Sequence, residues 1–214
     1  MTATGVTATQ TQDNPTNQER RTMASRQRIL DAAVLCLVEQ GYSGASTLQI
    51  QERAGVSRGR LLHHFPSRDD LLVAAAEHLA ANRVTALRGE SAEAITARDG
   101  SGVRIDQAIE QMWRSFHQPY FWAAIELWIA ARHNVYLRES LGPVERQLYK
   151  EIQQTLKAMF GPAHAAHPRF RLVTDLLVTS MRGVAVTYGF NDRPPATDPH
   201  VAQWKQLARE LLAR

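Results

Sequence analysis

The chain has 214 residues, 44% of them hydrophobic, and carries a formal net charge of +4. This length allows one compact unit or a small domain joined to a larger one, and the hydrophobic content excludes a wholly disordered chain. No apolar run is long enough to span a membrane, and the first residues lack the pattern of a signal peptide. We therefore expect a cytoplasmic protein that does not associate with membranes. The single cysteine, Cys36, falls in a helical pattern and is expected in the core.

Basic residues are concentrated near the N-terminus. From Glu19 to Arg68, eight arginines stand against four acidic residues, whereas the chain from Asp69 onward has seventeen basic and sixteen acidic residues. A surface that binds phosphate groups is therefore expected in the first third of the chain.

Residues 1–22 are predicted to be a disordered tail, because this polar stretch has too few apolar side chains to offset the entropy of ordering. Arg20 and Arg21 at its end fit a solvated linker and a DNA-contacting arm equally well. The first helix is expected to begin at residue 23 or 24 and to run to residue 40, where Gly41 ends it.

Two short helices joined by a tight turn are predicted over residues 46–65. Ser46, followed three residues later by Gln49, has the spacing of a capping box that begins the first of them. Gly55 can adopt a left-handed backbone at little cost and so allows the turn. The second helix is expected over residues 58–64.

Ser57 is a good N-cap for this second helix, which presents Arg58 and Arg60 in its first turn. Gly59 between them would let the backbone approach another molecule closely. A recognition helix enters the DNA major groove with its N-terminal residues at the base edges, and arginine is the commonest bidentate partner of guanine. The pattern predicts that at least one arginine reads a base; otherwise both bind phosphates.

An ordered set of residues with fixed spacing surrounds these helices: Gly41, Tyr42, Ile50, Ala54, Gly55, Val56, Ser57, Gly59, Leu61, His64, Phe65, Ser67, Arg68, Asp69, Asp70, Leu71 and Leu72. This set resembles the DNA-binding signature of the tetracycline-repressor (TetR) family, and the resemblance covers residues 26–79. Two positions depart from the usual pattern. Gln51 stands where the family usually has alanine, and Leu62 stands where it usually has tyrosine, a common phosphate contact.

The resemblance implies an all-α protein of about nine helices, with a helix-turn-helix DNA-binding domain at residues 23–66 and an effector-binding and dimerisation domain at residues 67–214. It implies a sequence-specific transcriptional regulator, a homodimeric repressor that a small-molecule effector releases from a palindromic operator. The alternative is a small-molecule-binding or architectural helical dimer that associates with DNA nonspecifically.

The expected DNA contacts lie on the two short helices, their caps and the start of the next helix. By resemblance, His64 and Arg68 contact phosphates, whereas the hydroxyls at the caps fit pure capping as well as capping combined with phosphate contact. Metal binding by the adjacent histidines is not expected, because neighbours on a helix point in different directions. The candidate residues are Ser46, Thr47, Ser57, Arg58, Gly59, Arg60, Leu62, His63, His64 and Arg68.

Ser67 should cap a longer helix that begins at Arg68 and runs to about Leu87, and in the family this helix transmits the effector signal by tilting. A polar loop is expected over residues 89–102. Further helices are expected over residues 103–117, 119–134 and 143–160.

Aromatic side chains gather in this middle section. Such a stripe is usually plain core; the alternative is a pocket for an apolar or aromatic small molecule, with a few polar groups to orient it. The candidate ligand-binding residues are Trp113, Phe116, His117, Phe121, Trp122, Glu126 and His133.

Two helices are expected near the C-terminus, over residues 168–190 and 199–212. Small residues around Ser180 and Gly183 permit close helix packing. In the family, two such helices pair with those of a second subunit as a four-helix bundle; packing within one chain is the alternative. A two-fold dimer would match palindromic double-stranded DNA.

Motifs for catalysis are not visible in the sequence. It has no phosphate-binding glycine loop, no His-Glu-x-x-His zinc pattern and no Gly-x-Ser-x-Gly elbow. We therefore expect no enzyme activity and no cofactor.

Overall fold

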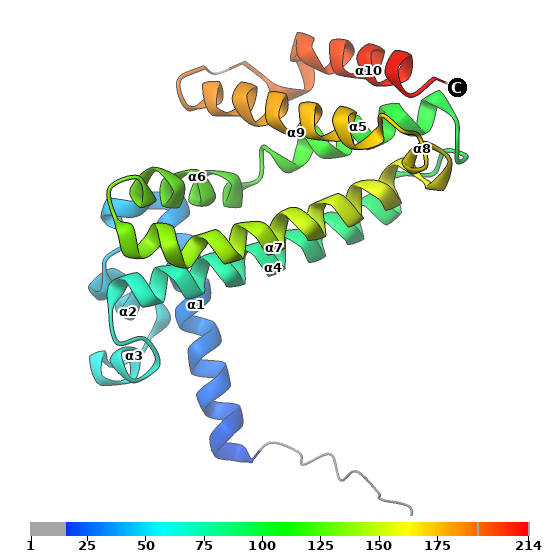
Figure 1. Cartoon of the computed structure of the whole chain (residues 1–214). Coiled ribbons are helices and arrows are strands. Elements are labelled where there is room, and N and C mark those ends of the chain that lie inside the picture. Colours follow the sequence, from blue (N-terminus) through cyan, green and yellow to red (C-terminus); the bar gives the residue numbers. More distant parts are fainter. Residues whose placement is uncertain (1–15, 192, 214) are drawn as a thin grey trace, which may run out of the picture.

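The computed structural model describes residues 16–191 and 193–213, and this part of the chain consists of helices without any strand. The expected all-α class is confirmed, with ten α-helices in the described residues (Figure 1). They are α1 (Asn17–Gly44), α2 (Thr47–Ala54), α3 (Arg58–His64), α4 (Arg68–Ala94), α5 (Gly102–Ser115), α6 (Pro119–Ala131), α7 (Val135–Phe160), α8 (Pro162–Ala165), α9 (Phe170–Val186) and α10 (Pro199–Leu211).

Helix α1 begins six residues before the expected start. Its N-terminus is a capping box, in which the Thr16 side chain accepts a hydrogen bond from the Glu19 amide at 3.3 Å and the Glu19 carboxylate accepts one from the Thr16 amide at 2.6 Å. Residues 17–22 of the predicted disordered tail are therefore helical; residues 1–15 lie outside the described part.

Gly41 ends the regular part of α1, as predicted. Its φ of 68° and ψ of −176° lie in a region of backbone space that is essentially restricted to glycine. A Cβ added at this position would lie 2.9 Å from a carboxylate oxygen of Glu126 in α6. The kink thus brings the end of α1 close against α6.

The first of two cores joins α1–α4 to α6 and to the start of α7. Its fully buried side chains include Ile29 of α1, Ile50 of α2, Leu61 of α3 and Leu71 of α4. Ala123 and Leu127 of α6 and Leu137 and Leu141 of α7 belong to the same core, as does Cys36, which is buried as expected. One apolar core therefore continues across the expected domain boundary at residues 66 and 67.

The second core lies at the far end of the molecule and is built from α5, α6, α7, α9 and α10. Helices α4 and α7 run side by side between the two ends, while α9 and α10 lie together near the C-terminus (Figure 1). None of the helices in the described residues combines the length and apolarity needed to cross a membrane.

Two expected boundaries in the middle of the chain are wrong. Helix α7 begins at Val135 rather than at Pro143, because the Asn134 side chain caps it by accepting from the Leu137 amide at 3.1 Å and the turns before Pro143 bury Leu137 in the first core. Helix α4 continues beyond Leu87, so the connection to α5 is residues 95–101 rather than the expected 89–102.

Comparing Gly41→Ala with Gly55→Ala distinguishes two causes of lost stability: backbone strain, which both variants have, and a collision with Glu126, which only Gly41→Ala has. Gly55 has φ 63°, and its new Cβ would meet nothing within 4 Å, so the strain alone should lower the free energy of unfolding by about 1 kcal/mol. Alanine at Gly41 should cost about 1–3 kcal/mol from strain, plus the displacement of Glu126. Urea denaturation of both variants measures the difference, and equal losses would contradict the close packing of Gly41 against α6.

Candidate nucleic-acid interface and internal pocket

Helices α2 and α3 form the predicted helix-turn-helix. Gly55 adopts the left-handed conformation after α2, and the Val56 amide donates to the Gln51 carbonyl at 3.2 Å, which closes the turn. The Ser57 side chain accepts from the Arg60 amide at 3.3 Å and so caps α3. The side chain of Leu61 is 1% exposed and holds α3 against the first core.

The outer face of α3 is open. Arg58, Gly59, Arg60, Leu62 and His63 are all exposed, and a Cβ added at Gly59 would meet no atom within 4 Å. The expected contact residues of this helix therefore share a surface that another molecule can approach closely.

A basic hollow adjoins this face. It measures about 350 Å³ and lies between α1 and the turn before α3, where Arg21 and Arg28 of α1 lie beside Ser57 and Arg60. Arg21 was considered, with Arg20, as part of a DNA-contacting arm, whereas Arg28 was counted only in the local charge. Their spacing, with Ser25 between them, places them on one helical face, and that signal could have identified them.

His64 connects α3 to α1. Its Nε2 lies 2.8 Å from the Ser25 hydroxyl oxygen, and the Ser25 hydroxyl donates to the Thr22 carbonyl. Partial burial, followed by the nearby His63 and Arg60, lowers the pKa of His64. The expected phosphate contact of His64 stays a prediction.

Arg68, the other expected phosphate contact, is engaged within the protein. Its Nε donates to the Ala45 carbonyl at 3.0 Å, a terminal nitrogen donates to the Tyr42 carbonyl, and the guanidinium lies 4.2 Å from the centre of the Tyr42 ring. Arg68 thus binds the start of α4 to the end of α1. Its phosphate contact, too, stays a prediction.

Ser46 is the N-cap of α2 and Thr47 is its first residue. The Ser46 side chain accepts from the Gln49 amide at 3.3 Å, so the predicted capping interaction is present. Both residues are partly exposed.

The seven candidate ligand-binding residues do not share one cavity. Trp113, Phe116 and Phe121 are each at most 4% exposed and belong to the second core, which agrees with the plain-core interpretation. His117 lies between the rings of Trp113 and Tyr188, at centroid distances of 4.3 and 4.9 Å.

The remaining three candidates lie on α6 and just after it. The Trp122 ring packs so closely against Gly189 that an added Cβ would lie 2.8 Å from a ring carbon. Glu126 accepts a hydrogen bond from the Tyr42 amide at 2.8 Å and, with His133, lines a shallow hollow at the end of α1. Glu126 therefore links α6 to the helix-turn-helix region.

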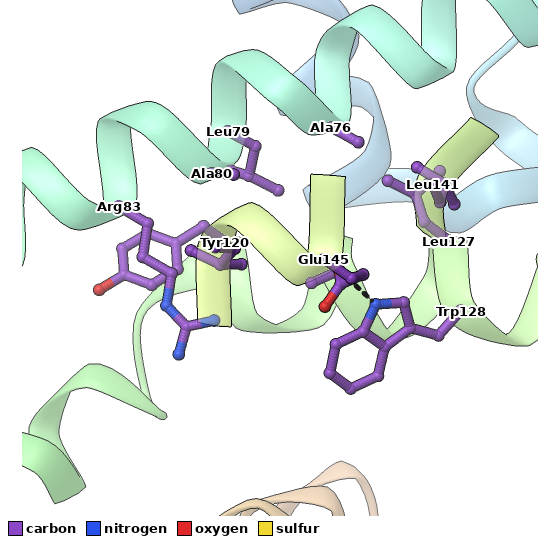
Figure 2. Close-up of a pocket in the computed structure, with 11 residues that line it drawn as sticks. Ala76, Leu79, Ala80, Arg83, Tyr120, Leu127, Trp128, Leu141 and Glu145 are labelled. Carbon is purple, nitrogen blue, oxygen red and sulfur yellow. Dashed lines mark hydrogen bonds between the residues drawn. The ribbon is translucent and has the colours of Figure 1, made fainter. Parts of the chain in front are cut away.

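An internal pocket lies elsewhere, between α4, α6 and α7 (Figure 2). Its polar side chains are Arg83 of α4, Tyr120 of α6 and Glu145 of α7, and Glu145 accepts a hydrogen bond from the Trp128 indole at 2.7 Å. Tyr120 and Trp128 belong to the aromatic middle section of the sequence, whereas no local pattern connects Arg83 and Glu145 to it. The pocket is lined by Ala76, Leu79, Ala80, Arg83, Tyr120, Ala124, Leu127, Trp128, Leu141, Glu145 and Leu148.

A capped helix-turn-helix with an exposed basic recognition helix, joined to a larger helical body, defines a DNA-binding regulator. The family described as "Bacterial regulatory proteins, tetR family" matches residues 29–75. The transcriptional regulator CymR of Pseudomonas putida is 32% identical over 170 residues, which cover 79% of this chain and 81% of CymR. The chain therefore belongs to the TetR family of transcriptional regulators.

Other relatives agree with this assignment. The transcriptional repressor AcnR of Corynebacterium glutamicum is 42% identical over 69 residues, covering 32% of this chain and 33% of AcnR. The multidrug binding protein EbrR, solved in complex with imidazole, is 26% identical with a TM-score of 0.55 and coverage of 87% and 93%. A regulator from Rhodococcus sp. Rha1 is 23% identical, with a TM-score of 0.60 and coverage of 88% and 96%, and shares the fold.

The family consists of regulators that bind DNA and small-molecule effectors and are not enzymes. The expectations of a TetR-family member and of a protein without enzyme activity are therefore confirmed.

The lowered pKa of His64 predicts acid sensitivity of the fold. The unfolded chain takes up a proton near the ordinary histidine pKa of about 6.5, while folded His64 resists protonation, so its contribution to stability is complete above this pH and is lost as the pH falls below it. His64→Gln should flatten the decrease in unfolding free energy between about pH 7.5 and 5.5. His63→Gln, on the exposed face, is the control; equal slopes for wild type and His64→Gln would contradict the prediction.

Proposed function

We propose that the chain is a homodimeric repressor that binds a palindromic operator through α3 and is released by a small-molecule effector bound between α4, α6 and α7. The observation that carries the proposal is the exposed Arg58–Gly59–Arg60 face of α3, fixed by the buried Leu61 and adjoining the arginine-lined hollow. Residues 23–66 serve as the DNA-binding unit and residues 67–214 as the effector-binding and dimerisation unit.

DNA contacts divide into two kinds by their place on this surface. Arg58 and Arg60 lie in the first turn of α3, where side chains reach base edges, and His63 and Leu62 follow on the same exposed face. Arg21 and Arg28 flank α3 from α1, where phosphate contact is the expected role. The AcnR relative, named a repressor, matches this chain over one third of its length, which supports the direction of regulation.

Effector binding can reach α3 through two sets of contacts. Helix α6 lines the pocket with Tyr120 and Trp128 and holds the Tyr42 amide through Glu126. At the start of α4, Asp69 accepts from the Asn134 side chain at 2.8 Å, just before α7. A ligand that separates these helices would shift the populations of DNA-binding and non-binding arrangements, provided it binds the two with different affinity.

The dimer surface is an apolar stripe on α9 and α10. Ser180 of α9 accepts from the Trp204 indole of α10 at 3.0 Å, which fixes the two helices together. Leu172 (57% exposed) and Leu176 (49%) lie four residues apart on one face of α9, and further large apolar side chains are exposed at its end, just beyond it and on α10: Val186 (39%), Phe190 (83%) and Leu207 (40%). Pairing with a second copy would bury such side chains.

The Arg60→Ala variant tests base reading. Loss of a bidentate base contact should weaken binding to the operator by about 1–3 kcal/mol and spare scrambled DNA. Arg28→Ala, which removes a phosphate contact, should weaken both complexes alike and reduce the dependence of affinity on salt. Titrations of the chain's own upstream DNA and of scrambled DNA at two salt concentrations, with footprinting, provide the measurement. Equal losses in Arg60→Ala would instead favour nonspecific association.

A double substitution, Leu172→Glu with Leu176→Glu, tests the dimer surface. In a dimer formed through this face, the two new carboxylates of each subunit would be buried opposite those of the other, which should dissociate the dimer and lower operator affinity. The fold should be retained, because both side chains are exposed in the monomer. Light scattering after size-exclusion chromatography gives the mass. Val103→Glu, 61% exposed on α5, is the matched control and should remain dimeric. A dimer that survives the double substitution would place the interface elsewhere.

A further inference from the structure

The internal pocket contains a guanidinium without an anionic partner. The Nε of Arg83 is buried and has no hydrogen-bond partner, and no carboxylate lies within 4 Å of the guanidinium among the described residues. Its neighbours are aromatic rings: Phe116 at 5.9 Å and Tyr120 at 5.4 Å from the ring centres. Burial lowers the pKa of Arg83, which reflects the cost of keeping an unpaired charge away from water.

No carboxylate contacts this guanidinium directly. Glu145, the acidic residue that lines the pocket, accepts a hydrogen bond from the Trp128 indole, and its negative charge favours the charged form of Arg83 only from beyond ion-pair distance. A second guanidinium, that of Arg182 on α9, lies 4.8 Å from the centre of the Trp128 ring. The Tyr120 hydroxyl is buried and lacks a hydrogen-bond partner among the described residues. The pocket lining therefore holds one guanidinium and one hydroxyl without hydrogen-bonded anionic partners, and a second guanidinium lies beside its Trp128 ring.

The rest of the lining is apolar and the space is narrow. Four leucines, Leu79, Leu127, Leu141 and Leu148, and three alanines contribute the walls. The free internal volume is about 20 Å³, which suffices for about one water molecule. Any larger occupant must part α4 from α6 and α7, so its binding is coupled to the helix arrangement.

We propose that the effector is an apolar molecule bearing one carboxylate, with the carboxylate held by Arg83 and the Tyr120 hydroxyl and the apolar body against the leucine walls. Guanidinium and carboxylate match in geometry and form charge-assisted, often bidentate hydrogen bonds. Figure 2 shows Arg83 and Tyr120 next to each other at one end of the pocket, with Glu145 and Trp128 at the other. This proposal rests on the effector function proposed above and names the chemistry of its ligand.

The competing role for Arg83 is structural, because its stacking on Phe116 and Tyr120 could stabilise the empty protein. Ligand-free stability separates the two roles. An arginine kept for an absent anion destabilises the empty protein, so Arg83→Met should leave the melting temperature unchanged or raise it. Arg104→Met is the control for a structural arginine, since Arg104 donates to the Met159, Ala158 and Ala97 carbonyls at 2.9–3.0 Å and its loss should lower the melting temperature.

Ligand binding tests the chemistry directly. Two matched pairs of probes, 2-naphthoate with 2-naphthamide and octanoate with octanamide, differ within each pair only in the polar group, a carboxylate against a neutral amide of similar size. By isothermal titration calorimetry, the wild type should prefer an acid over its amide by about tenfold or more, and Arg83→Met should abolish that preference while still binding the amide. Arg88→Met, outside this pocket where Arg88 of α4 pairs with Glu151 of α7, should bind like the wild type.

Each outcome decides between the roles. A wild type without preference for either acid, or an Arg83→Met variant that keeps the preference, would overturn the proposal, as would a marked loss of ligand-free stability in Arg83→Met. Operator binding measured with and without the acids tests the repressor function separately. If an acid binds through Arg83 but leaves operator affinity unchanged, the carboxylate-binding proposal is supported and the proposal of effector release is contradicted.

Discussion

A helix of seven residues buries too little surface to form alone in water, so α3 depends on the core beneath it. Leu61 and Phe65 enter the first core, and that core includes side chains from α6 and α7 as well as from α1, α2 and α4. The recognition helix is therefore built on the same apolar cluster as one wall of the internal pocket. A change in how α6 packs cannot remain confined to one end of the molecule, because interiors are close-packed and transmit strain.

A second constraint is the cost of burying the Arg83 guanidinium in a narrow pocket without a contacting anion. Charge burial without a partner lowers stability, and proteins tolerate such groups mainly where function uses them. In the present structure the pocket is nearly filled by its own side chains. If an anion binds Arg83 as proposed, the free energy of that contact can offset the cost of separating helices that otherwise pack together. The ligand then binds the separated arrangement more tightly than the packed one, as regulation requires.

Local sequence signals predicted the helix-turn-helix well. Ser46, Gly55 and Ser57 act through backbone contacts within a few residues, so their caps and turn could be read from spacing alone. The sequence also contained the signal for the start of α1, because Thr16 is followed three residues later by Glu19. The polar composition of residues 1–22 nevertheless led to the prediction of a disordered tail.

Features that depend on tertiary packing could not be predicted in this way. Pro143 reads as a helix start, yet the burial of Leu137 and Leu141 holds the preceding turns in the helix. The pocket side chains Arg83, Tyr120 and Glu145 come from three helices, and no spacing rule connects them. The aromatic stripe was visible, but the sequence did not reveal which members face the core and which face the pocket.

Arg68 has a mechanical consequence. Because its guanidinium holds the carbonyls of Tyr42 and Ala45, the first turn of α4 and the end of α1 are joined by a rigid joint rather than by a hinge. A rotation of α4, about 40 Å long for its 27 residues, would then turn α1–α3 as one body without deforming them. In a two-fold assembly the α4 helices of the two subunits would rotate by the same angle in opposite senses. The displacements of the two recognition helices would then add, so a small rotation near the pocket would change the distance between them by twice the displacement of one.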